Sequence, residues 1–238
     1  MTTSGTSSFD LNLTEIVEEA FERAGSELRT GYDLKTARRS LNLLFADWAN
    51  RGINLWTVEQ GSISLTAGTG QYDLPVDTVD LLEHVIRTND GSVSNQSDLT
   101  ISRISVSTYA SIPSKLNQGR PIQVYIDRQS GTTSPTGTQA PNINVWPVPD
   151  RSSFYTFVYW RMRRIQDAST GAVSFDVPFR FLPCLTAGLA YYLALKVPNG
   201  MERLTLLKSM YDETCELAAG EDREKASDRL VPRQMFIT

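Results

Sequence analysis

Residues that often carry out catalysis are scarce in this chain of 238 residues, which has a single histidine, His84, and two cysteines, Cys184 and Cys215. A Ser-His-Asp hydrolase would have to use His84, yet no serine stands in a Gly-x-Ser-x-Gly motif. One histidine and two distant cysteines cannot provide zinc ligands at the usual spacing. The sequence therefore predicts no catalytic residue, no metal site and no cofactor, and we interpret His84 as a structural strand residue.

Long apolar runs and an excess of basic residues are also lacking. The longest uncharged apolar stretch, 181–195, is interrupted by Pro183 and Gly188 and is shorter than the ~20 residues of a membrane-spanning helix. The first twelve residues show no secretory signal, so we expect synthesis in the cytoplasm and free, buried thiols. Acidic residues outnumber basic ones by 27 to 23, giving a net charge of −4. This balance disfavours a surface that grips DNA phosphates.

Helical patterns occupy both ends of the sequence. Asn12 and Glu15 form a capping box at the start of the first predicted helix, which Gly25 ends. A second helix is predicted from about Asp33 to Asn50, so the first fifty residues indicate an antiparallel helical hairpin. Helical spacing returns over 179–196 and again from 201 to about 225.

The pattern between these helices is that of strands. Alternation of apolar and polar residues, with frequent Gly, Pro, Ser and Asn, predicts strands at 63–66, 79–87, 99–104, 122–126, 143–148 and 154–163. Gly68-Thr69-Gly70 is interpreted as a turn, because it lacks the remaining residues of a nucleotide-binding loop. The predicted fold class is α+β. Residues 1–57 and 176–238 form a helical bundle with a C-terminal tail, and residues 58–175 form an inserted antiparallel β-sandwich or barrel.

Two charged clusters are candidate interaction sites. Arg161, Arg163 and Arg164 end an aromatic strand, where an ion pair between subunits or domains is favoured over contact with nucleic acid. That strand is apolar on both faces, so it lies centrally in a closed β domain or packs against another subunit. A second cluster is an acidic stripe on the first helix, either a solvated face or the lining of a channel. Its members are Glu15, Glu18, Glu19 and Glu22.

The C-terminal tail, 230–238, is more apolar than a solvated terminus requires. Either it frays, or it becomes ordered by inserting its apolar side chains into a groove of a partner. The residues predicted to bind the partner are Leu230, Val231, Pro232, Arg233, Met235, Phe236 and Ile237.

A family resemblance covers most of the chain in order. The two segments Ile16 to Gly25 and Ala37 to Gly52 resemble the opening helices of head-to-tail adaptor proteins of short-tailed bacteriophages, also called tail accessory factors or tail tubular proteins. Further similar segments are Ile53 to Leu65, Gly119 to Pro121, Tyr125 to Arg128, Trp146 to Asp150, Tyr159 to Arg164 and Phe179 to Pro183.

The resemblance implies a structural virion protein at the junction of portal and tail. It implies a ring of twelve subunits that binds the portal protein, the tail nozzle protein and its neighbouring subunits, contacts no membrane, and lets double-stranded DNA pass without sequence specificity. The tail 230–238 would then bind the portal, and the acidic stripe would face the channel. Two alternatives remain open from sequence: a virion-associated glycan hydrolase, since its two carboxylates could be chosen among 27 acidic residues, and an independent carbohydrate-binding β module.

Overall fold

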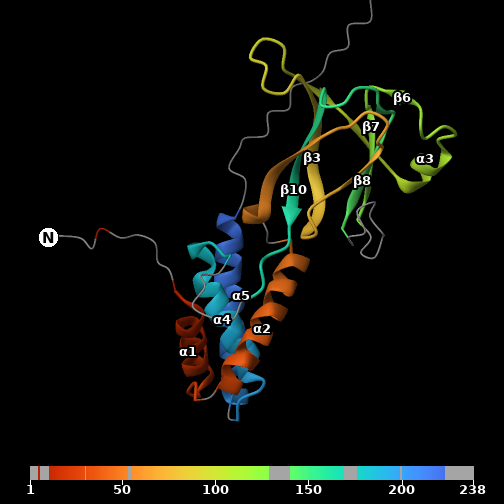
Figure 1. The fold of residues 1–238 in the computed structure, drawn as a ribbon. Coiled ribbons are helices and arrows are strands. Elements are labelled where there is room, and N and C mark those ends of the chain that lie inside the picture. The colour runs from red at the N-terminus through yellow and green to blue at the C-terminus, as the bar shows by residue number, and fades with distance from the viewer. Residues whose placement is uncertain are drawn as a thin grey trace, which may run out of the picture. The chain divides into compact units, whose positions relative to one another are not determined.

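A computed structural model describes residues 5, 11–29, 31–52, 55–128, 140–168, 176–198 and 200–222 (Figure 1). The chain divides into two compact units. One comprises residues 1–55 and 166–238 and is helical, and the other comprises residues 56–165 and holds the sheets. The boundaries predicted from sequence, at 57/58 and 175/176, lie later in the chain than those between the two units, by two residues at the first point and ten at the second.

The described residues of the helical unit form four α-helices: α1 (Leu13–Ala24), α2 (Gly31–Asn50), α4 (Leu182–Ala194) and α5 (Leu204–Glu221). Short 3-10 turns, η2 (Phe179–Phe181) and η3 (Gly200–Arg203), precede the last two helices, and η1 (Leu55–Thr57) leads into the sheet unit. The capping box of α1 is confirmed. The Glu15 amide donates to Asn12 Oδ1 at 2.9 Å, and the Asn12 amide donates to Glu15 Oε2 at 2.8 Å. Gly25 ends the helix with a φ of +88°, a conformation that favours glycine.

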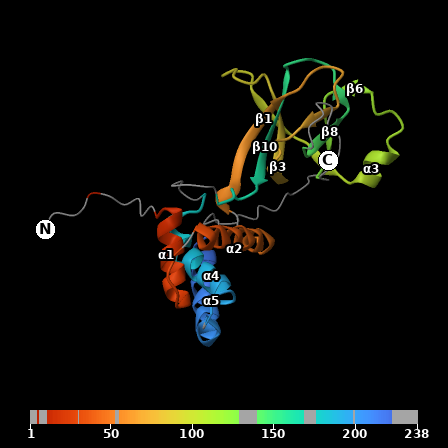
Figure 2. The ribbon, with the colours of Figure 1, turned by 60° about the horizontal axis from the view of Figure 1, so that its bottom comes forward.

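The central helix of this unit is α4, which contacts α1, α2 and α5 (Figures 1 and 2). Helices α1 and α2 also contact each other, but less than each contacts α4, so the two predicted helices of the first fifty residues pack mainly against α4. Gly188 allows α5 to approach, because an added Cβ would lie 2.8 Å from the Tyr211 ring. Six large side chains of these helices are buried: Phe21, Leu41, Phe45, Trp48, Leu189 and Leu207.

Where the structure describes the sheet unit, at 56–128 and 140–165, it contains two four-stranded sheets and one short two-stranded sheet. The first sheet has the order β1 (Val58–Ser64), β10 (Tyr155–Arg163), β3 (Thr78–Thr88), β4 (Ser97–Thr100). The second has the order β2 (Gln71–Asp73), β8 (Asn142–Trp146), β7 (Gln123–Asp127), β5 (Ser102–Ile104). β6 (Gln118–Gly119) pairs with β9 (Val148–Pro149), and α3 (Val106–Ser111) follows β5.

One hydrophobic core joins the two larger sheets. Tyr155, Phe157 and Tyr159 of the central strand β10 lie in it with Val124 of β7 and Ile143 of β8. The prediction of a mixed helix and sheet protein is confirmed, and the aromatic strand lies between β1 and β3. Within the described residues the sheets end in unpaired edge strands, so they do not close into a barrel.

The predicted wholly antiparallel pairing is wrong at two places, because β5 pairs with β7, and β6 with β9, in parallel. A parallel pair needs a crossover of about a dozen residues or more, and the segment 105–122, which includes α3, provides one between β5 and β7. The single strand predicted over 99–104 is divided at Ile101. Here the chain passes from the first sheet to the second, and the Ile101 side chain enters the shared core.

Candidate interaction surfaces

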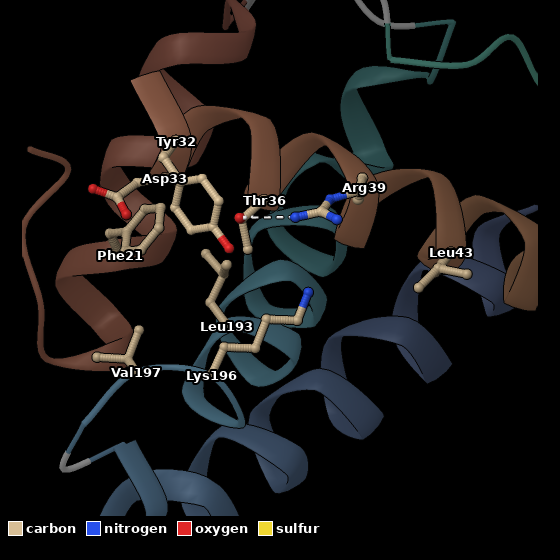
Figure 3. Close-up of a pocket in the computed structure, with 9 residues that line it drawn as sticks. All are labelled: Phe21, Tyr32, Asp33, Thr36, Arg39, Leu43, Leu193, Lys196 and Val197. Atoms are coloured by element: carbon tan, nitrogen blue, oxygen red, sulfur yellow. Dashed lines mark hydrogen bonds between the residues drawn. The ribbon is translucent and has the colours of Figure 1, made fainter. Parts of the chain in front are cut away.

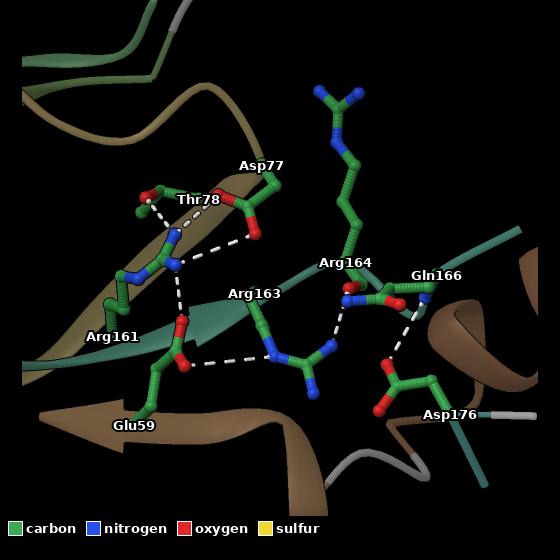
Figure 4. A network of polar contacts seen from close by, with 8 residues as sticks. All are labelled: Glu59, Asp77, Thr78, Arg161, Arg163, Arg164, Gln166 and Asp176. Carbon is green, nitrogen blue, oxygen red and sulfur yellow. Dashed lines mark hydrogen bonds and ion pairs between the residues drawn. The ribbon is translucent and has the colours of Figure 1, made fainter.

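Arg161 forms the centre of an ion-pair network within the sheet unit (Figure 4). Its Nη1 donates to Asp77 Oδ1 at 2.6 Å and to Thr78 Oγ1 at 2.9 Å, and its Nη2 donates to Glu59 Oε1. The Arg161 side chain is 11% exposed, and the hydrogen bond from its guanidinium lowers the pKa of Asp77. The network ties β10 to β1, which carries Glu59, and to the start of β3.

The pairing of β10 with β3 is irregular next to Arg161, as in a β-bulge. The pairing of β10 with β3 shifts its register between Trp160 and Arg161, and again between Met162 and Arg163. A bulge changes the direction in which the following side chains point. Glu59 lies opposite Arg161 in the regular register of β1 and β10, and the register shift lies on the other side of β10, which faces Asp77 and Thr78 at the start of β3.

The three arginines predicted to lie between subunits have different surroundings. Arg161 is satisfied within its own chain, and Arg163 Nε lies 3.8 Å from Glu59 Oε2 while its Nη1 donates to the Arg164 carbonyl at 3.2 Å. Arg164 is exposed, and its side chain has no ion pair within the part of the chain that the structure describes (Figure 4). Of the three, Arg164 therefore has the charge most accessible to another subunit.

The acidic stripe of α1 is exposed at all four positions, Glu15, Glu18, Glu19 and Glu22. Glu15 completes the capping box, and Glu19 pairs with Arg23 at 2.7 Å, one turn along the helix. Glu18 and Glu22 have no ion pair among the described residues. The structure thus places the predicted residues together on one surface, where two carboxylates are used locally and two are available to a solvent channel or a partner.

The two cysteines and His84 pack against other side chains of the protein. Cys184 and Cys215 are buried free thiols, as predicted, and their mutual hydrogen bond together with burial raises the pKa of Cys184. Burial lowers the pKa of His84, whose ring lies 5.8 Å from that of Phe157 between centroids.

The predicted tail residues 230–238 lie outside the described residues. Among the residues that are described, no His, Cys, Asp or Glu cluster is suited to hold a metal ion, and none of the helices is long and apolar enough to span a bilayer.

Sequence reasoning did not identify the partners of Arg161. Glu59 and Asp77 are far from Arg161 in the chain, and only the pairing of β1 and β3 with β10 brings them together. The sequence offers only a weak signal for these pairs, namely that Glu59 and Asp77 lie shortly before predicted strands and Arg161 near the end of another. Strand order was needed to turn that signal into a pair.

The structure describes a two-unit α+β protein with exposed charged surfaces, and comparison with known protein families identifies its family. The family model described as SU10 adaptor protein matches residues 11–233, nearly the whole chain. The chain therefore belongs to the SU10 adaptor protein family, which confirms the resemblance to phage head-to-tail adaptors. A search of curated proteins finds no match.

Family membership gives the coarse function. The protein is a bacteriophage structural adaptor and a component of the virion, which interacts with other head or tail proteins. A structural adaptor family also implies a role without catalysis.

Proposed function

We propose that the protein joins the phage head to the tail as a ring of twelve subunits bound beneath the portal. The ring extends the DNA channel, retains and releases the genome, and provides a platform for the tail nozzle protein. The family match over residues 11–233 is the observation that supports this role. The net charge of −4 and the exposed Glu18 and Glu22 are consistent with a channel that DNA passes without binding, because carboxylates at the channel wall repel the DNA phosphates and release no counterions from them.

In this proposal the apolar tail attaches the adaptor to the portal. Val231, Met235, Phe236 and Ile237 would enter a groove of the portal, with Arg233 at its polar rim. An apolar segment that is ordered by its partner makes attachment depend on the portal being present.

Deletion of residues 230–238 is expected to leave thermal unfolding unchanged and to abolish attachment to portal rings of the same phage. Attachment is measured by co-sedimentation and by negative-stain imaging of the rings. The matched control is Gln234→Ala, which changes the same segment but keeps its apolar side chains. Normal attachment of the deleted protein would refute the role of the tail.

Charge reversal at Arg164 is expected to weaken assembly of the ring and to leave folding intact, because its side chain has no ion pair within the described chain. Arg164→Glu is compared with Arg120→Glu, which reverses another exposed arginine of the same unit. Ring formation on portal is counted by imaging, and folding is followed by thermal unfolding. Equal assembly of the two variants would show that Arg164 is not at a subunit interface.

A further inference from the structure

The helical unit has a groove of about 480 Å³ between α2 and the end of α4 (Figure 3). Phe21 of α1 closes one end, and Leu193 lies at its base. Tyr32 and Leu43 of α2 border it, and both remain largely exposed, Leu43 at 60%. The groove therefore leaves apolar surface in contact with water.

Two cations line this groove without a carboxylate partner. Lys196, in the turn after α4, donates to Ser40 Oγ at 2.6 Å, and Arg39 Nη2 donates to Thr36 Oγ1 at 3.3 Å. Neither forms an ion pair within the described residues. Burial and the nearby Arg39 charge lower the pKa of Lys196. The acidic lining residue, Asp33, accepts a hydrogen bond from the Arg29 backbone amide at 3.4 Å. With two cationic side chains and one carboxylate, the groove lining carries an excess of positive charge.

A second surface, on α5, has the complementary character. Leu206, Met210 and Leu217 are exposed and follow one another at helical spacing, so they form a ridge along one face of the helix. Glu213 lies on the same ridge and Glu216 beside it, and neither has an ion pair among the described residues. The ridge is distinct from the buried face of α5, which packs through Leu207, Tyr211, Cys215 and Ala218.

We propose that the groove of one subunit binds the α5 ridge of a second copy of the chain. Leu206, Met210 and Leu217 would cover the apolar surface at Tyr32 and Leu43, and Glu213 and Glu216 would supply the carboxylates that Arg39 and Lys196 lack. Because the groove and the ridge are different patches, the contact is head-to-tail, and such a contact builds a ring when the rotation between neighbouring subunits closes. This inference rests on the proposed ring and specifies the surfaces that build it.

A charge-swap experiment tests the pairing. The groove variant, Arg39→Glu with Lys196→Glu, carries two acidic patches, and the ridge variant, Glu213→Lys with Glu216→Lys, carries two basic patches. Each variant alone brings like charges together and is expected to associate at least ~10-fold more weakly than the wild type, measured by sedimentation velocity over a concentration series. An equimolar mixture restores opposite charges at every contact, so association should return. Lys208→Glu, on another face of α5, is the matched control and should leave association unchanged.

Zero-length carbodiimide coupling provides a second readout that also captures weak association. A mixture of ¹⁴N-labelled and ¹⁵N-labelled wild-type protein should yield mixed-isotope peptides that link Lys196 to Glu213 or Glu216, both free and on portal rings. Absence of these links in both settings, or failure of the mixture to restore association, would overturn the pairing. If deletion of 230–238 removes association while the charge swap does not restore it, the groove binds the tail instead. Attachment to portal rings is measured in a separate experiment, so the proposed head-to-tail role can be supported even when the pairing of groove and ridge is overturned.

Discussion

Replacing Trp48 by alanine is expected to lower the free energy of unfolding of the helical unit by about 3 to 5 kcal/mol, the usual cost of removing a fully buried large aromatic side chain. Trp48 is completely buried, and its ring centroid lies 5.9 Å from that of Phe45 and 5.5 Å from that of Phe181. It connects α2 to the entry of α4. Loss of the indole leaves a cavity that rigid helices on several sides can fill only in part.

The indole also makes a buried hydrogen bond, since Trp48 Nε1 donates to the Tyr211 hydroxyl at 3.1 Å. Burial raises the pKa of Tyr211, which therefore keeps its proton and donates to Asp47 Oδ2 at 3.5 Å. Trp48→Phe keeps most of the ring volume but loses the hydrogen bond, so it should cost about 1 kcal/mol plus a smaller packing loss.

Both Trp48 variants are checked by denaturant unfolding followed by far-UV circular dichroism, which reports the helices. Leu43→Ala, on the same helix but 60% exposed, serves as the matched control and should change stability by no more than about 0.5 kcal/mol. An alanine variant at Trp48 as stable as the Leu43 variant would show that the α2–α4 contact does not hold the unit together.

The helices could be predicted from the sequence because their signals are local. The side chains of Asn12 and Glu15 satisfy amides within one turn, and Gly25 supplies a left-handed conformation next to the helix that it ends. Burial of Trp48 and Phe45 follows from spacing along α2 alone. Each of these features can be predicted without information on what the helix packs against.

Partners far apart in the chain could not be predicted in the same way. An amphipathic pattern shows that α1 and α2 each have an apolar face, but it does not show that both faces meet α4 more than each other. Periodicity likewise marked 99–104 as extended without revealing that Ile101 divides it between two sheets. The groove at Arg39 and Lys196 was not predicted, because exposed apolar and cationic residues leave no periodic signal when they come from a helix and a distant turn.

Removing the Arg161 guanidinium is expected to destabilise the sheet unit by about 2 kcal/mol, the scale of a hydrogen bond to a charged group whose donor is mostly buried. Arg161→Ala leaves Glu59 and Asp77 without the cation that holds both. The loss stays moderate because these carboxylates are about half exposed and can be rehydrated. Arg128→Ala is the matched control: it breaks an exposed pair with Asp80, worth at most about 1 kcal/mol.

The pH dependence of unfolding distinguishes this ion-pair role from simple packing. The hydrogen bond from Arg161 lowers the pKa of Asp77 in the folded protein. The ion pair therefore stabilises the fold above the pKa of Asp77 in the unfolded chain, about 4, and this stabilisation is lost as the pH falls through the lower pKa of Asp77 in the folded protein. The gap in stability between the wild type and Arg161→Ala should therefore be widest near neutral pH and narrow in acid. Denaturant unfolding at neutral pH and at about pH 3 measures it. A gap that is the same at both pH values would mean that Arg161 contributes through its aliphatic stem and not through its charge.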